Sequence, residues 1–126
     1  MEYKNLLILL IIIILIDSVY LYTFFNRFSN QIKTIQKDDI TINYVSTFVV
    51  YLLITLGLYY FTQNEENLNK KLLNAAILGL VTYGVFDFTN GAIFKNWQTE
   101  LSIIDTLWGS LLMTSSIYVY EKISKN

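Results

Sequence analysis

The 126-residue sequence contains neither cysteine nor histidine. Without cysteine there is no disulfide and no thiolate nucleophile, and without histidine the usual zinc sites, haem ligation and Ser-His-Asp triads are excluded too. Only oxygen and amide side chains remain for chemistry, and no cofactor motif is visible. The sequence therefore predicts no catalytic residue and no cofactor, although a pair of carboxyl groups could still act as general acid and base.

Charge is also scarce and balanced. Only 15% of the residues are charged, with nine Lys and Arg against ten Asp and Glu and a net charge of −1. No dense basic run is present to contact a phosphate backbone, so a nucleic-acid partner is excluded. In contrast, 54% of the residues are hydrophobic, which is more than an ordinary soluble domain carries. The lipid bilayer is the expected surrounding.

Four apolar segments are long enough to cross a bilayer, which takes about 20 mostly apolar residues. They cover residues 6–25, 42–61, 72–94 and 101–120. The last three are joined by short connections, which favour antiparallel neighbours. The sequence thus predicts an all-α fold, with residues 1–126 forming a single membrane domain. We expect an integral membrane four-helix antiparallel bundle.

The first apolar segment has a rival interpretation as a cleavable signal peptide, because Lys4 precedes it. The small-x-small cleavage pattern is missing, and three more apolar segments follow, so we expect a retained helix. The polar connection after it, residues 26–41, carries Phe28, Ile32 and Ile35 at near-helical spacing. That spacing predicts a short interfacial helix.

Basic residues divide almost evenly between the two ends of such a bundle. Lys4, Lys70, Lys71, Lys122 and Lys125 belong to one end, and Arg27, Lys33, Lys37 and Lys95 to the other. Four crossings place both termini on the same face. The positive-inside rule, by a margin of one residue, favours a multi-pass protein with both termini in the cytoplasm.

Inside the apolar segments lie three acids and an amide, Asp17, Asp87, Asp105 and Asn90. A carboxylate in the hydrocarbon core costs on the order of 3 kcal/mol unless it is compensated. With a rise of about 1.5 Å per residue and antiparallel helices, the three acids fall on the same side of the midplane, toward the first and third connections. No Lys or Arg lies within the spans to pair with them. We therefore expect the acids to approach one another and not all to stay ionised.

The polar residues fall on helical stripes. Tyr83, Asp87 and Asn90 are spaced i, i+4, i+7, and Asp105 and Trp108 form the corresponding stripe of the last segment. Small residues let membrane helices approach closely. The glycines placed to do so are Gly79, Gly84, Gly91 and Gly109.

Two interpretations of this cluster stay open. In the first, the protein binds or translocates a small polar solute, cation, proton or lipid headgroup. The candidate ligand-binding residues are then Asp17, Tyr83, Asp87, Asn90, Asp105 and Trp108. A divalent metal on the three acids is conceivable through oxygen ligands, but without histidine it cannot resemble the usual transition-metal sites, and we assign no metal.

In the second interpretation the chain is a structural or accessory membrane protein. It packs against a membrane partner or forms a homo-oligomer through its glycine faces, and the acids are interhelical hydrogen-bonding groups. Asp87 would then hydrogen-bond to Tyr83 and Asn90. On that basis Asp87→Leu should destabilise the bundle by leaving both residues without a partner.

Two motifs carry a resemblance to a known family. One reads Tyr-Gly-x-x-Asp-x-Thr-Asn from Tyr83 to Asn90, and the other reads Asp-x-x-Trp-Gly from Asp105 to Gly109, with Trp97 between them. Together they resemble the membrane family called domain of unknown function 2177. The resemblance is strong over the second half of the chain and looser over the first. It implies a four-helix membrane fold and supplies no activity.

The sequence departs from this family pattern at three positions. Phe86 stands where the family commonly has Tyr, Gln98 where Pro often follows the Trp, and Tyr20 where the first helix tends to have Trp. A hydroxyl at position 86 is therefore dispensable here, or this copy has diverged. The motif residues Asp87, Asn90, Asp105 and Trp108 are the ones that the antiparallel topology brings together.

Overall fold

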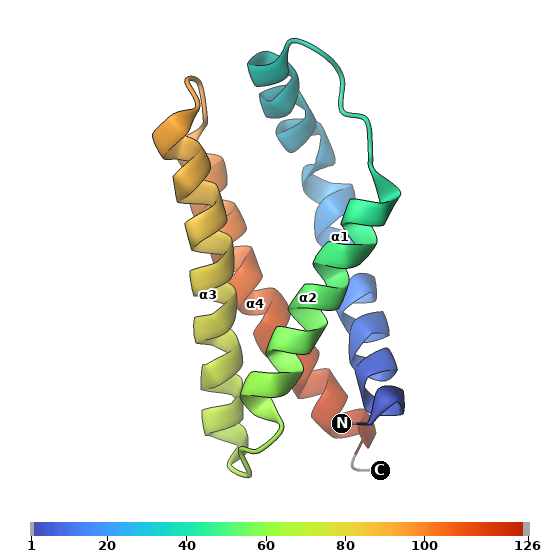
Figure 1. The fold of residues 1–126 in the computed structure, drawn as a ribbon. Helices are drawn as coiled ribbons and strands as arrows, with labels where there is room; N and C mark the ends of the chain where they lie inside the picture. Colours follow the sequence, from blue (N-terminus) through green and yellow to red (C-terminus); the bar gives the residue numbers. More distant parts are fainter. Residues whose placement is uncertain (1, 125–126) are drawn as a thin grey trace.

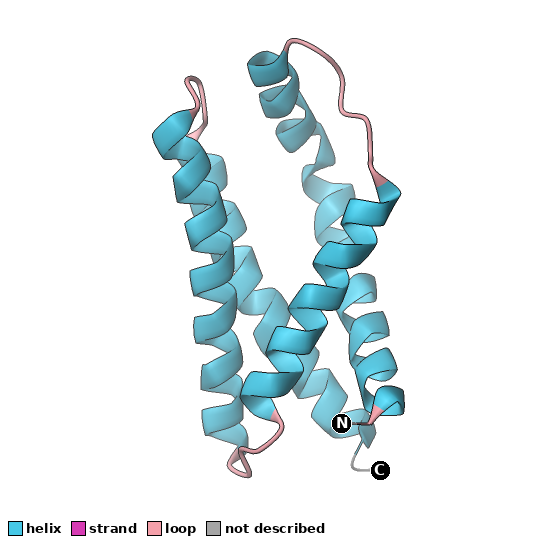
Figure 2. Cartoon of the chain, viewed as in Figure 1, coloured by secondary structure: helices cyan, strands magenta, loops and turns pink. Residues whose placement is uncertain are grey.

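The computed structural model describes residues 2–124, which fold into four α-helices and contain no strand. The helices are α1 (Tyr3–Gln36), α2 (Tyr44–Thr62), α3 (Leu68–Ile93) and α4 (Thr99–Ser124). They run up, down, up and down, so α1 begins and α4 ends at the same end of the bundle (Figure 1). Only short loops lie outside the helices (Figure 2). The predicted all-α membrane bundle is confirmed.

Three of the helices, α1, α2 and α3, are long and apolar enough to cross a membrane within residues 2–124. α4 has 26 residues but carries more polar side chains. Ser102 and Ser116 among these are buried, and so is the small residue Gly109. α4 is thus the helix whose small and polar residues face the other helices.

α1 is much longer than its apolar segment. Its 34 residues extend about 51 Å, well beyond the roughly 30 Å hydrocarbon core. The polar stretch after residue 25 continues the same helix to Gln36, where Lys37 in the left-handed region (φ 64°) ends it. The separate interfacial helix expected there is therefore not found.

Tertiary contacts explain why this extension of α1 does not lie flat on the membrane. Gln31 is 2% exposed, and its Oε1 accepts a hydrogen bond from the backbone N–H of Gln98 in the α3–α4 turn. Arg27 pairs with Glu100, at the start of α4, across 3.4 Å. The extension is thus fixed to the turn between α3 and α4.

α2 and α3 begin at residues that suit helix starts. Asn43 caps α2 by accepting the N–H of Ser46 at 3.0 Å, and Asn67 caps α3 by accepting that of Lys70 at 3.1 Å. Such caps satisfy backbone donors that the first helical turn leaves without partners. Local sequence therefore sets where the first two of the three connections end and α2 and α3 begin.

The densest packing joins α3 to α4. A Cβ built on Gly79 would lie 2.1 Å from the carbonyl oxygen of Gly109, and a Cβ on Gly109 would lie 2.2 Å from Cγ of Tyr83. The predicted close approach of helices at glycine is confirmed at these two positions. Gly79 and Gly109 therefore mediate the contact between α3 and α4 of the same chain.

The apolar core occupies the end of the bundle that holds the start of α1. Its buried members are Leu9, Ile13, Leu58, Tyr59, Ala75, Leu112, Met113 and Ile117. At the opposite end, the start of α2 lies away from α3 (Figure 1), while α1 stays joined to the α3–α4 turn through Gln31 and Arg27. The cavities described below lie in that second half.

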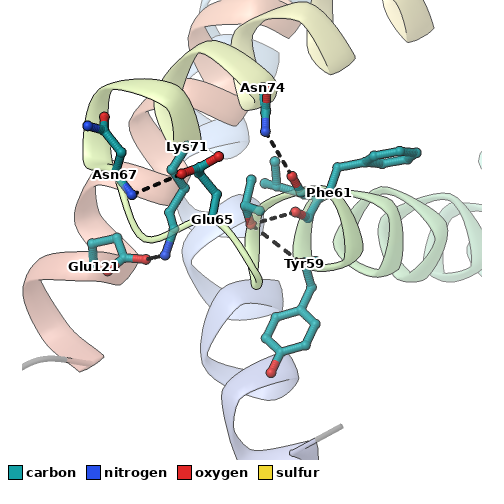
Figure 3. Close-up of polar contacts among 9 residues, drawn as sticks. Tyr59, Phe61, Glu65, Asn67, Lys71, Asn74 and Glu121 are labelled. Carbon is teal, nitrogen blue, oxygen red and sulfur yellow. Dashed lines mark hydrogen bonds and ion pairs between the residues drawn. The ribbon is translucent and has the colours of Figure 1, made fainter.

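A buried ion pair closes the end of the bundle near the α2–α3 turn (Figure 3). Lys71 in the first turn of α3 contacts Glu121 near the end of α4, and their side chains are 11% and 8% exposed. In the same turn Glu65 accepts the N–H of Asn67 at 3.1 Å, and Asn74 donates to the carbonyl of Phe61 at 3.3 Å. These contacts fix α3 against both of its neighbours.

Candidate functional site

Asp17 joins three helices through its carboxyl group. It lies on α1 and is 6% exposed. It accepts hydrogen bonds from the Trp108 indole Nε1 of α4 at 2.8 Å and from the Tyr51 hydroxyl of α2. Both donors lie in the first half of their helices, so Asp17 sits in the half of the bundle nearest the first and third connections.

Asp105 is linked to the same group of residues by Tyr20. The Tyr20 hydroxyl donates to Oδ1 of Asp105 at 3.1 Å. The Tyr20 ring stacks on Trp108 with centroids 4.7 Å apart and planes 9° from parallel. Asp17 and Asp105 are therefore held by two stacked aromatic side chains whose polar atoms point to different acids.

Asp87 is the exception. It is 1% exposed, and neither of its carboxyl oxygens accepts a hydrogen bond from an N–H or hydroxyl donor among residues 2–124. Its neighbour is the carboxyl group of Asp105, which can form a side-chain hydrogen bond with Asp87 when the two acids share a proton but supplies no positive charge. Burying a charge without a partner is costly, so Asp87 is the least compensated group of the bundle.

The structure brings the three acids together, as the antiparallel topology predicts. Asp17 and Asp105 share the Tyr20–Trp108 stack, and Asp87 and Asp105 border a common cavity. The acids nevertheless do not share one coordination sphere. Among residues 2–124 no group of three or more acidic side chains is placed to hold a metal ion.

Tyr83 and Asn90 have different positions from those expected. Tyr83 lies against Gly109 and borders the two cavities on either side of α2. Asn90 is partly exposed, and its side chain makes no hydrogen bond within residues 2–124. The expected hydrogen bonds from Asp87 to these two residues are absent, since within residues 2–124 no N–H or hydroxyl group donates to the oxygens of Asp87.

Sequence reasoning missed Tyr20 and Tyr51 as partners of the acids. Tyr20 lies three residues after Asp17, on the same face of α1. Tyr51 lies well inside the second apolar segment, away from the interfacial positions that tyrosine prefers. A tyrosine so deep in an apolar segment needs a polar partner for its hydroxyl group, and this was the feature of the sequence that could have identified Tyr51.

A cavity of about 1050 Å³ opens between α1 and α2 beside these acids. Asp17, Tyr51 and Tyr83 contribute the polar groups of its wall within the bundle. Most of the remaining wall is apolar and includes Leu21, Phe25, Val50 and Ile54, with Thr23, Asn26 and Thr47 as further polar residues. The cavity is thus apolar with one strongly polar region.

A second cavity of about 230 Å³ lies between α1 and the α3–α4 pair. Asp87 and Asp105 are its acidic residues, and aromatic side chains make up much of the rest of its wall. It reaches Trp97 in the α3–α4 turn, where the indole Nε1 donates to Ser102 at 2.8 Å. Asp87 and Asp105 therefore both border this cavity, whereas Asp17 borders the larger one.

The different partners of Asp17 and Asp87 predict opposite responses to the same substitution. Asp17→Leu removes the acceptor of two donors and should lower the free energy of unfolding by about 2 kcal/mol. Asp87→Leu removes a buried charge without a partner, so stability should stay the same or rise by about 1 kcal/mol. Equilibrium unfolding in detergent checks both. A destabilised Asp87→Leu variant would show that the carboxyl group has a partner after all.

Comparison with known proteins supports the resemblance noted from the motifs. The family model described as "Predicted membrane protein (DUF2177)" matches residues 3–120. The match therefore includes α1 and α2 as well as the motif-bearing second half. Comparison with curated proteins and with solved structures gave no match.

Proposed function

This chain belongs to the DUF2177 family of predicted membrane proteins, and we propose that it binds an amphiphilic ligand from the bilayer, such as a lipid. The observation that carries the proposal is the cavity of about 1050 Å³ between α1 and α2. Binding sites for small molecules are mostly apolar, with a few polar groups that fix orientation. The walls of this cavity have that composition.

The polar end of the ligand is assigned to Asp17. Its carboxyl group accepts two hydrogen bonds from the protein. A carboxylate offers about four acceptor positions, so capacity remains for a donor on the ligand. The Tyr83 hydroxyl, which forms no hydrogen bond within residues 2–124, is a second polar contact. A hydroxyl, amide or ammonium group fits this end of the cavity.

The proposal includes four membrane crossings. α4 is less apolar than the other helices, but Ser110 donates to the carbonyl of Ala76 at 3.0 Å and Trp108 donates to Asp17. Polar groups that form hydrogen bonds inside a bundle are not exposed to the apolar lipid, so they are compatible with a membrane-spanning helix. We place both termini in the cytoplasm, following the small excess of basic residues at that end.

A structural role remains the second candidate, and one observation favours it. Residues 44–50, the first two turns of α2, are exposed, and the buried residues of α2 are Thr55, Leu58, Tyr59 and Thr62. A membrane partner or a second copy of the chain could cover this stretch. Gly79 and Gly109 are already packed between α3 and α4, so a contact with a partner would form through α2.

A matched pair of substitutions distinguishes these candidates. Val49 and Val50 are both about half exposed, but Val50 borders the cavity between α1 and α2 and Val49 does not. Val50→Trp should obstruct the cavity, and Val49→Trp should add the same side chain on the lipid side. Native mass spectrometry of protein released from nanodiscs should find a bound lipid in wild type and in Val49→Trp, and should not find it in Val50→Trp.

Two other results would count against the proposal. Lipid retained equally by all three proteins would place it outside the cavity. A lipid-free dimer of the wild type that Val49→Trp or Val50→Trp converts to a monomer would support the structural role instead.

A further inference from the structure

We propose that the smaller cavity binds an organic ammonium group, with Asp87 and Asp105 as its anionic contacts. This site is separate from the Asp17 cavity, and it does not depend on what that cavity holds. Its volume is about 230 Å³, enough for a small amine or for the headgroup of a lipid.

Asp87 is the residue that indicates a ligand. It is 1% exposed, both oxygens lack an N–H or hydroxyl donor among residues 2–124, and it borders the cavity. The carboxyl group of Asp105 can share a proton with it but supplies no positive charge. Buried polar groups in folded proteins almost always have a partner. The Asp17 carboxyl group, with donors from Tyr51 and Trp108, shows how this same bundle compensates an acid. A cation from outside the chain would compensate Asp87 in the same way.

Within residues 2–124 no basic side chain fills this role. The residues that border the cavity include no Lys or Arg. Arg27, on the same helix as Tyr20, is directed to Glu100 at 3.4 Å. Lys71 contacts Glu121 at the other end of the bundle. The two acids therefore give the cavity a negative field.

The aromatic walls select the kind of cation. Hard metal ions require a shell of oxygen ligands, and aromatic rings cannot supply it. Aromatic faces attract ammonium groups through their quadrupole and also pack against the methyl or methylene groups that surround the nitrogen. The aromatic residues that border the cavity are Tyr20, Phe24, Phe25, Phe28, Phe86 and Trp97. Rings together with two carboxyl groups are the chemistry of ammonium recognition.

The depth of the site allows such a group to enter. Asp87 lies six residues before Ile93, the last residue of α3, or about 9 Å along the helix. Trp97, which also borders the cavity, lies in the turn beyond that helix end. A soluble amine or the ammonium of a lipid headgroup can therefore reach the carboxyl groups without crossing the membrane.

Choline and its neutral isostere, 3,3-dimethylbutan-1-ol, test the proposal directly. The full chain is placed in nanodiscs of phosphatidylglycerol, which has no ammonium, and each compound is titrated by calorimetry against sodium chloride of equal ionic strength. We expect saturable binding of choline in the millimolar range or tighter, and at least tenfold weaker binding of the alcohol. Equal binding of the two compounds, or none of choline, would overturn the proposal.

Matched variants locate the binding. Asp87→Asn should weaken choline binding at least tenfold, whereas Glu66→Gln, which removes one exposed charge at the far end of the bundle, should not change it. Phe86→Leu removes one aromatic face and should weaken binding about threefold. The control is Phe88→Leu, because Phe88 is exposed and does not border the cavity. Choline binding unaffected by Asp87→Asn in a folded variant would contradict the assignment.

The source of the ammonium is resolved by changing the lipid. If phosphatidylcholine added to the nanodiscs competes with soluble choline, the site takes a lipid headgroup. If it does not compete, the site takes a free amine. Both outcomes leave the ammonium chemistry in place. Neither depends on whether lipid occupies the Asp17 cavity, which the Val50→Trp experiment measures separately.

Discussion

Gly79→Ala is expected to destabilise the folded bundle by about 3 kcal/mol, near the upper end of the usual cost of overpacking. The new Cβ would lie 2.1 Å from the carbonyl oxygen and 2.6 Å from the carbonyl carbon of Gly109. Both atoms belong to the backbone, so no side chain can rotate away and α3 must separate from α4. Reversible unfolding in detergent, followed by circular dichroism, measures the loss.

Gly57→Ala is the matched control for this prediction. Gly57 also lies in a helix, but the nearest atom to its built Cβ is Cδ2 of Leu78 at 3.9 Å, an ordinary contact. Replacing a helical glycine by alanine in open space stabilises by about 0.5 to 1 kcal/mol. The two substitutions should therefore have opposite signs. Similar effects at both positions would mean that α3 and α4 are not in the close contact described.

Lys71→Met is expected to lower the free energy of unfolding by about 3 kcal/mol, because it removes the cation beside a buried carboxylate. Lys71 and Glu121 have side chains only 11% and 8% exposed, so little water is available to replace the contact. Replacing both residues removes the charge along with its partner. Lys71→Met combined with Glu121→Met should thus recover most of the lost stability.

The exposed pair of Lys33 and Asp39 provides the comparison. Its nitrogen and oxygen are 3.1 Å apart, but the side chains are 63% and 80% exposed. Surface ion pairs contribute about 0 to 1 kcal/mol, so Lys33→Met should change the unfolding free energy very little. If the Lys71 single variant were as stable as the Lys33 variant, the end of the bundle would have to be open to water.

The buried pair and the acid cluster show two ways in which this bundle treats internal charge. Near the chain ends, Glu121 faces Lys71, a cation of the same chain. Near the opposite end, Asp17 and Asp105 are held by hydroxyl and indole donors, and Asp87 is left without any. The second region is bordered by sizeable cavities with acids in their walls. Both proposed binding sites follow from that asymmetry.

The outline of the fold was available from the sequence because a bilayer imposes a simple requirement. A helix satisfies its own backbone hydrogen bonds, so an apolar run of sufficient length must form one. The acids could also be placed at one depth, since position along a helix is fixed by a constant rise. The length of α1 was less predictable, because its polar extension is stabilised by Gln98 and Glu100, far away in the chain.

The sequence did not predict the hydrogen-bond partners of the acids. Helical spacing places Tyr83, Asp87 and Asn90 on one stripe, which predicted bonds among them, yet Asp87 makes none with either. Residues on one stripe of a helix all point toward a neighbouring helix, so their partners lie there and not beside them. Tyr51 and Trp108, which donate to Asp17, come from two other helices.

The sequence by itself therefore determined four helices, their antiparallel order and the common depth of three acids, since each depends on distance along one chain. Tertiary structure alone decided that Asp17 and Asp105 have donors and that Asp87 does not. It also decided that α1 and α2 diverge to leave cavities beside the acids. These outcomes depend on the rotation and tilt of each helix against the others, which many side-chain contacts set jointly and no local pattern encodes.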